Sequence, residues 1–253
     1  MRRAALMEEK TPILEVRNLV KFFGGVQALR GVSFKLFPRE VLALLGDNGA
    51  GKSTTIKIIS GYLKPDGGEI FLEGKRVIFS SPLHARSMGI ETVYQDLALF
   101  GVLDVTTNLF IGRETCQLGM LQKRVMKRAT WQILQKMRTT IKSIRQKVQT
   151  LSGGQQHAVA IGRSVYVGGV PKILIMDEPT AGLGIEESQK VLELIRELRE
   201  KGIAIILISH NLEHVFCVAN RIVVLRSGEL VGERCTEETN QSEVVHLMMG
   251  VTC

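Results

Sequence analysis

The residues of this sequence best suited to chemistry begin with a glycine-rich stretch, GDNGAGKS, at Gly46–Ser53. It matches the pattern G-x-x-x-x-G-K-[ST] and stands between an apolar run of strand length and a helical pattern. Glycines let successive backbone N–H groups turn toward phosphate oxygens, and a helix N-terminus adds partial positive charge. Lys52 can reach the β- and γ-phosphates, and the Ser53 hydroxyl can bind Mg²⁺. The stretch, called the phosphate loop below, therefore predicts a site for a nucleoside triphosphate.

Two consecutive acids follow a later apolar run, in ILIMDE. Asp177 ends the expected strand, where its carboxylate can face a metal ion beside the phosphate loop. Glu178 comes directly after it and is placed to polarise a water molecule for attack on the γ-phosphate. Together with the phosphate loop, the pair predicts hydrolysis of the nucleotide as well as binding.

A second glycine-rich stretch, LSGGQ at Leu151–Gln155, opens the helix-like sequence QHAVAIGRSVYV. Ser152 is a good N-cap, and Gly153 and Gly154 expose backbone N–H groups at the positive end of the helix. A plain capped helix is the alternative, but it would not need both glycines and Gln155. If the two anion sites serve one nucleotide and lie too far apart in one molecule, two copies arranged head to tail would join them.

The order of apolar and amphipathic segments along the chain predicts an α/β fold with a mostly parallel sheet covered on both faces. Branched and aromatic residues indicate strands at 13–23 and 31–37, broken by Gly24-Gly25 and Gly31, and we expect an N-terminal antiparallel β part beside the nucleotide-binding core. Apolar runs then alternate with amphipathic patterns, which gives the following order: strand 40–46, helix after the phosphate loop, hairpin 65–74, strand 172–179, helix 184–202, strand 203–210, helix 211–220 and hairpin 221–233.

An inserted α-helical subdomain is expected at about 97–165, within a single domain of residues 1–253. From Leu97 to Val148 strong β patterns are missing, and five apolar residues recur at helical spacing: Met126, Ala129, Ile133, Met137 and Ile141. We interpret this stripe as the subdomain's own core.

The net charge of +8 has a local source, because residues 121–147 carry nine Lys or Arg and no Asp or Glu. A solvated helical face is the simplest interpretation. The alternatives are a patch facing an anionic membrane or, less favoured because Trp131 is its only aromatic residue, nucleic acid. No apolar run approaches the roughly 20 residues that span a bilayer.

Two further motifs are Gln95 in VYQDL and His210 in ISH. Together with the phosphate loop, LSGGQ and Asp177-Glu178, they occur in the order and spacing of an ABC transporter ATP-binding subunit. The chain resembles such a subunit along nearly its whole length. The resemblance implies that Phe23 stacks on adenine, that Gln95 binds Mg²⁺ with Ser53 and Asp177, and that His210 contacts the γ-phosphate. It assigns catalysis to Glu178, His210 and Lys52. It assigns ATP binding also to Gly46, Asp47, Asn48, Gly49, Ala50, Gly51, Ser53 and Thr54, and binding of the partner's ATP to Ser152, Gly153, Gly154 and Gln155.

The resemblance further implies the cofactors ATP and Mg²⁺, a homodimer, a separate transmembrane permease, an extracytoplasmic solute-binding protein, and a place at the cytoplasmic face of the membrane. No nucleic-acid partner is expected. LGDNGAGKST, FGGVQAL and DEPTAGLGIEES look most like subunits of monosaccharide importers. Importers of branched-chain amino acids or other small solutes are one alternative. A soluble ABC-type ATPase acting on nucleic acid or ribosomes, or a nucleotide-binding regulator without turnover, is another.

The sequence departs from the family pattern at two places. Gly184 stands where the loop after Asp177-Glu178 usually ends in aspartate, which removes a carboxylate implied in coupling two sites. After LSGGQ, His157 and Gly162 replace commoner residues, and a glycine inside a helix is expected to cost up to about 1 kcal/mol relative to alanine.

Overall fold

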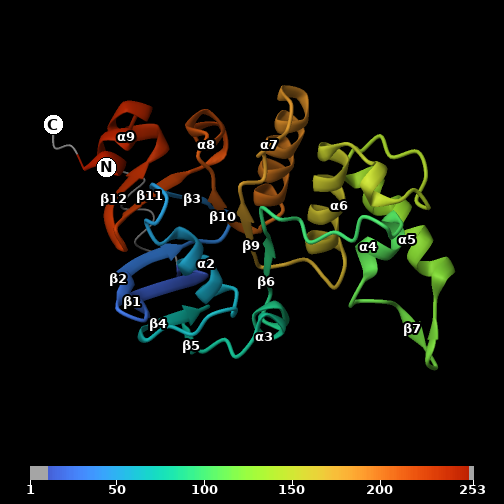
Figure 1. Ribbon diagram of the computed structural model, residues 1–253, viewed down its shortest axis with the longest axis horizontal. Helices are drawn as coiled ribbons and strands as arrows, with labels where there is room; N and C mark the ends of the chain where they lie inside the picture. Colours follow the sequence, from blue (N-terminus) through green and yellow to red (C-terminus); the bar gives the residue numbers. More distant parts are fainter. Residues whose placement is uncertain (1–10, 251–253) are drawn as a thin grey trace.

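Two stacked sheets form the larger part of the protein in the computed structural model, which describes residues 11–250 (Figure 1). The smaller sheet is antiparallel, in the order β2-β1-β4-β5, with β1 Leu14–Phe23, β2 Val26–Leu36, β4 Gly67–Leu72 and β5 Lys75–Val77. The larger sheet has the order β12-β11-β3-β10-β9-β6, with β3 Val41–Leu45, β6 Ile90–Val93, β9 Ile173–Asp177, β10 Ala204–Ile208, β11 Arg221–Arg226 and β12 Glu229–Cys235. Every neighbouring pair in it is parallel except β11 and β12.

The predicted α/β fold, with a mostly parallel sheet and an N-terminal antiparallel β part, is confirmed. Every residue of β3 and of β10 is buried, because the sheet is covered on both faces. The antiparallel sheet and α2 (Lys52–Ile59) pack on one face, and helices pack on the other: α6 (Gly153–Tyr166), α7 (Ile185–Glu200), α8 (Leu212–Val218) and α9 (Gln241–Met249). One cover is thus largely a second sheet.

A group of helices lies at one end of the molecule, to the right in Figure 1. Helices α4 (Val105–Phe110), α5 (Lys123–Lys136) and α6 share an apolar cluster of their own. The expected helical stripe is wrong at its end, because Ile141 lies beyond α5 although it is buried in this cluster. A small hairpin, β7 (Cys116–Gln117) and β8 (Met120–Leu121), precedes α5 and was not predicted.

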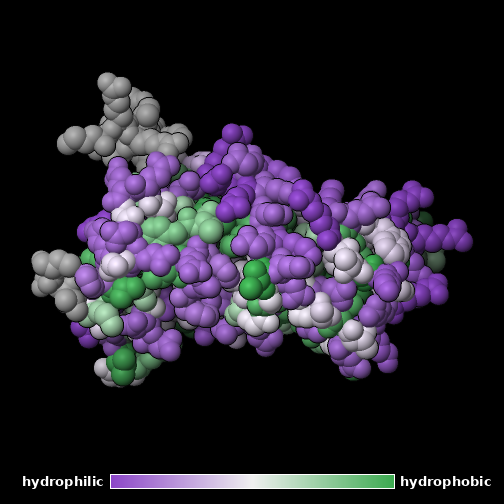
Figure 2. Space-filling model, turned by 90° about the horizontal axis from the view of Figure 1, so that it is seen from above, coloured by the Kyte–Doolittle hydropathy of each residue, from purple (hydrophilic) through white to green (hydrophobic). Residues whose placement is uncertain are grey.

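Short elements complete the chain: α3 (Pro82–Ser87) and two turns of 3₁₀-helix at Val148–Thr150 and Thr236–Glu238. Seen from above in Figure 2, the face of the long helices is largely hydrophilic, with apolar residues in smaller patches. This is the distribution expected of amphipathic helices whose apolar sides pack on a sheet. Between residues 11 and 250, the longest apolar helices fall short of what a bilayer span requires.

Two glycines differ from their predicted roles. Gly31 does not break a strand, because β2 continues through it with φ +92° and a shift in its register with β1. Gly162 is buried where α6 crosses α5, and a Cβ there would lie 2.9 Å from Cγ2 of Ile133. An alanine would therefore need Ile133 to move, so the helix-propensity cost predicted for this glycine is offset by packing.

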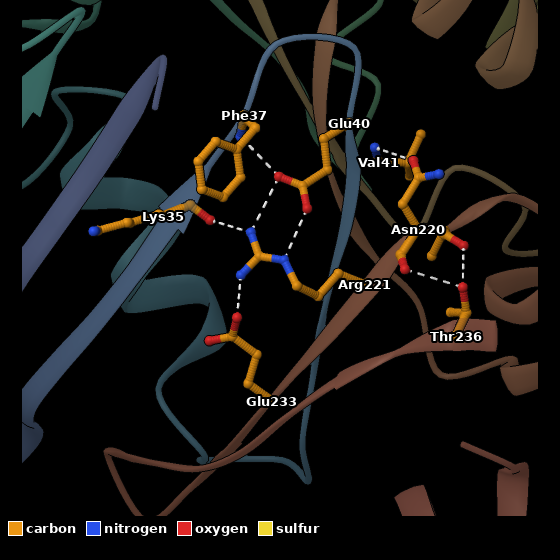
Figure 3. A network of polar contacts seen from close by, with 9 residues as sticks. Lys35, Phe37, Glu40, Val41, Asn220, Arg221, Glu233 and Thr236 are labelled. Atoms are coloured by element: carbon orange, nitrogen blue, oxygen red, sulfur yellow. Dashed lines mark hydrogen bonds and ion pairs between the residues drawn. The ribbon is translucent and has the colours of Figure 1, made fainter. Parts of the chain in front are cut away.

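A buried ion-pair network joins the two sheets (Figure 3). The Arg221 guanidinium, on β11, donates to Glu40 in a bidentate pair of 2.8 and 3.1 Å, and also to Glu233 and to the Lys35 carbonyl oxygen. Glu40 in turn accepts from the Phe37 N–H at 2.7 Å. Because this turn leads into β3, the network fixes the strand that delivers the phosphate loop.

Candidate active site

All the residues predicted to bind or hydrolyse the chain's own nucleotide line one cavity of about 660 Å³. The cavity lies where β3, β9 and β10 end, at the carboxyl edge of the parallel sheet. Its predicted members are Phe23, Gly46, Asp47, Asn48, Gly49, Ala50, Gly51, Lys52, Ser53, Thr54, Gln95, Asp177, Glu178 and His210. Segments that are more than 180 residues apart in sequence therefore meet at one site.

Four further residues line the same cavity and were missed from the sequence: Ala28, Ile208, Ser209 and Met248. Met248 is the least expected, because it comes from α9 near the other end of the chain from Phe23. Helix α9 was not predicted, although Asn240 caps it by accepting from the Glu243 N–H. A cavity that has both an apolar and an aromatic side chain in its lining suits a planar base.

Glycine is required at three positions of the phosphate loop, where Gly46, Gly49 and Gly51 have φ of +144°, +82° and +103°. A Cβ on Gly46 would lie 2.1 Å from the Leu225 carbonyl oxygen, whereas a Cβ on Gly49 would have nothing within 4 Å. Helix α2 then begins without a side-chain cap. Its first N–H groups are thus left for a ligand, and a phosphate fits this position.

The Lys52 ammonium lies over the loop, donating to the carbonyl oxygens of Gly46 at 2.6 Å and Asp47 at 3.0 Å. Burial lowers the pKa of Lys52, and the negative charges of Glu178, Asp47 and Asp177 oppose that shift. No carboxylate in residues 11–250 forms an ion pair with it at contact distance. The buried positive charge would therefore gain from an anionic ligand in the cavity.

Asp177 ends β9 and Glu178 follows it directly, and their environments differ. Burial, and then the charge of Glu178, raise the pKa of Asp177, while Lys52 and Lys57 oppose the shift. Oε2 of Glu178 lies 2.8 Å from Nδ1 of His210 but without the geometry of a hydrogen bond. This buried oxygen has no hydrogen-bond donor among the described residues, so it is available to accept from a water molecule.

The donor set near Asp177 fits Mg²⁺. Ser53, Gln95 and Asp177 offer a hydroxyl, an amide and a carboxylate oxygen to the same cavity, and Mg²⁺ prefers oxygen ligands completed by phosphates and water. A cation there would also oppose the burial and the negative charge of Glu178, which together raise the pKa of Asp177. In the described part of the chain, no group of three or more His, Cys, Asp or Glu could hold a metal ion.

The LSGGQ stretch lies elsewhere in the same chain. Ser152, Gly154 and Gln155 line a different cavity, which shares no residue with the first, and Figure 1 shows the sheet strands β9 and β6 between α2 and α6. Ser152 caps α6 by accepting from the Gln155 N–H at 3.3 Å, and Gln155 Oε1 accepts from the Ser152 N–H at 3.0 Å. Gln155 is therefore engaged in a reciprocal cap, a role the spacing S-x-x-Q could have indicated.

Phe23 and His157 have contrasting surroundings. Phe23 ends β1 with 47% of its surface exposed at the cavity, and the Lys21 ammonium lies 5.7 Å from the centre of its ring. His157 is buried, and its Nδ1 lies 3.0 Å from the carbonyl oxygen of Gly153. The His157 ring thus supports the first turn of α6 rather than the phosphate site.

Known proteins resemble this chain along most of its length. Residues 29–181 match the family model described as ABC transporter. The chain is 49% identical over 236 residues to the xylose/arabinose import ATP-binding protein XylG of Sulfolobus acidocaldarius, with 93% of each chain covered. It is 48% identical over 247 residues to the fructose import ATP-binding protein FrcA of Rhizobium meliloti, with 94% of each covered. A ribose import ATP-binding protein of Rubrobacter xylanophilus is 41% identical, and the chain spans 47% of its length.

Solved structures give the same result for the fold. The ADP conformation of an ATP-binding cassette of an ABC transporter superposes with a TM-score of 0.82 at 30% identity, covering 94% of this chain and 99% of that one. A nucleotide-free ATP-binding cassette superposes with a TM-score of 0.80 at 29% identity, covering 94% and 95%.

Proposed function

This chain belongs to the ABC transporter family, and we propose that it is the ATP-binding and ATP-hydrolysing subunit of a sugar importer. The observation that carries the proposal is the single cavity in which the phosphate loop, Asp177-Glu178, Gln95 and His210 meet. The subunit energises uptake through a separate permease.

In the proposed reaction, residues of this chain bind the phosphates, orient the attacking water and accept its proton. The phosphate loop and the N-terminus of α2 hold the phosphates, and Lys52 transfers its two hydrogen bonds from loop carbonyls to phosphate oxygens. Glu178 accepts a proton from the attacking water through its unpartnered Oε2, and His210 contacts the γ-phosphate. Ser53, Gln95 and Asp177 would hold Mg²⁺, which when bound neutralises charge on the phosphates.

The assignment of a sugar rests on relatives. The proteins whose length the chain matches are named for import of xylose/arabinose and of fructose. We carry the substrate class, not the individual sugar, to this chain. Branched-chain amino acids and other small solutes are the alternative substrates, and a binding screen must distinguish them from sugars.

A head-to-tail homodimer completes the proposed site. Within one chain the LSGGQ stretch and the phosphate loop line separate cavities, so Ser152, Gly153, Gly154 and Gln155 serve the nucleotide of a second copy. In the cell we expect the dimer at the cytoplasmic face of the membrane, on a permease that receives solute from an extracytoplasmic binding protein.

The test combines turnover with partner capture. Glu178→Gln should abolish steady-state ATP hydrolysis while leaving ATP binding intact, because it removes the base and keeps the side-chain shape. Lys52→Ala is the matched control, since it should weaken ATP binding itself. Full turnover by Glu178→Gln would refute the assigned base.

The same Glu178→Gln protein, tagged and extracted from native membranes with Mg-ATP, should recover a multispanning membrane protein. A solute-binding protein from the same system should then bind a sugar in a screen of sugars and amino acids. Recovery of only soluble or nucleic-acid-bound partners would overturn the importer and leave the ATP chemistry standing.

A further inference from the structure

A carboxylate from another helix reaches the LSGGQ stretch. Glu187, in the first turn of α7, accepts a hydrogen bond from the Ser152 hydroxyl, with Oγ and Oε1 3.2 Å apart. The same carboxylate packs against Gly154, where a Cβ would lie 2.6 Å from Cδ of Glu187. Its other oxygen, Oε2, lies 3.4 Å from the N–H of Gly184, in the loop that follows Glu178.

These contacts exceed what α7 needs for its own start. A glutamate at this position of a helix caps the helix by bonding the N-cap N–H, which here is that of Gly184. That role requires neither a bond to Ser152 nor a residue without a side chain at position 154. The carboxylate instead sits at the positive end of α6, where an anion is favoured. In the single chain, Glu187 therefore occupies the place of an anionic ligand.

The Ser152 hydroxyl has one proton to donate. In the single chain that proton is given to Glu187, and in the proposed dimer it would be given to a phosphate of the partner's ATP. A hydroxyl cannot donate to both, and a carboxylate and a polyphosphate held at one helix end repel each other. The geometry points to Glu187 as a positioning residue that holds Ser152 in the separate chain and releases it when two chains close on ATP. The inference rests on the head-to-tail dimer of the proposed function.

Release of Glu187 would also affect the loop at 181–184. Its contact with Gly184 ties the LSGGQ stretch to the loop at 181–184, and Leu183 of that loop lies under Gly153, 3.5 Å from where a Cβ would stand. This loop begins three residues after Glu178, whose backbone is fixed to the end of β10 through Ile208. Exchange of the Ser152 bond is thus placed to change the loop next to the proposed base.

The experiment measures the ATP concentration that gives half-maximal dimer formation of the full chain by analytical ultracentrifugation. All variants carry Glu178→Gln, so that bound ATP is retained. Glu187→Ala removes the competing acceptor and its charge, and should lower the required ATP concentration roughly three- to ten-fold, the range for one partly exposed, charge-assisted hydrogen bond. Glu187→Gln keeps a neutral acceptor and should shift it in the same direction by less. Glu186→Ala is the matched control, because Glu186 is the exposed neighbouring acid of the same turn.

A purely structural role for Glu187 predicts the opposite sign, since loss of a cap would weaken the ordered chain and raise the ATP requirement. An unchanged or raised requirement in Glu187→Ala, with the parent dimerising normally, would overturn this inference and leave the proposed function intact. Failure of the Glu178→Gln parent to dimerise with ATP would overturn the head-to-tail dimer, and this inference with it.

Discussion

Replacement of Arg221 by methionine isolates the energetic role of the network that joins the two sheets. Arg221 and Glu40 are 5% and 3% exposed, so the substitution leaves a buried carboxylate without its bidentate partner. Burial alone would disfavour the guanidinium, but the hydrogen bonds and charge of Glu40, and then of Glu233, outweigh it and raise the pKa of Arg221. Arg221 therefore keeps its positive charge.

The size of the effect follows from that burial. Breaking a buried pair by removing one partner costs about 3–5 kcal/mol, most of it from the uncompensated charge left behind. For a chain of this size, each kcal/mol corresponds to about 2–4 °C in Tm, so Arg221→Met should lower Tm by ~6–20 °C. Arg221→Lys keeps the charge but loses the planar fork, and should recover only part of the loss.

Urea unfolding followed by circular dichroism, without nucleotide, measures these free energies. Arg30→Met is the control, because its ion pair with Glu229 is 3.9 Å long with both side chains at least half exposed, and should cost less than about 1 kcal/mol. The double variant Arg221→Met with Glu40→Gln should lose less than the sum of the two single variants. A loss below 1 kcal/mol for Arg221→Met, or strict additivity in the double variant, would refute the assignment of a coupled buried pair.

Two further predictions concern the site and the helical end. The acid limb of the hydrolysis rate should lie at higher pH than an ordinary aspartate gives, because burial and Glu178 raise the pKa of Asp177, and the protonated form does not bind Mg²⁺. Added Mg²⁺ should move this fall in rate to lower pH in steady-state assays. A fall at the same pH whatever the Mg²⁺ concentration would contradict the prediction. Gly162→Ala should destabilise the protein by about 1 kcal/mol in urea unfolding, since overpacking against Ile133 outweighs the gain in helix propensity. A Gly162→Ala variant more stable than the parent would show that Ile133 moves aside without an energetic cost.

The local chemistry of this protein was readable from its sequence. Strand, glycine turn and helix N-terminus follow one another along the chain at Gly46–Ser53, so residue types and spacing alone predict a phosphate site. The same holds for Asp177-Glu178 after an apolar run and for the cap at Ser152. The buried strands β3, β9 and β10 were also predictable, since an apolar run as short as β10 is typical of a buried strand, whereas β6 was not predicted.

The tertiary structure decided what depends on distant segments. The pair Arg221–Glu40 joins residues 181 positions apart, and Met248 reaches the nucleotide cavity from α9. The sequence predicts that Gly162 destabilises α6, but the packing of α5 against it leaves little room for a side chain. The contact of Glu187 with Ser152 likewise crosses from α7 to α6. No pattern within one segment predicts such contacts, because each depends on how separate elements pack. A motif, by contrast, consists of residues that are close together in the sequence.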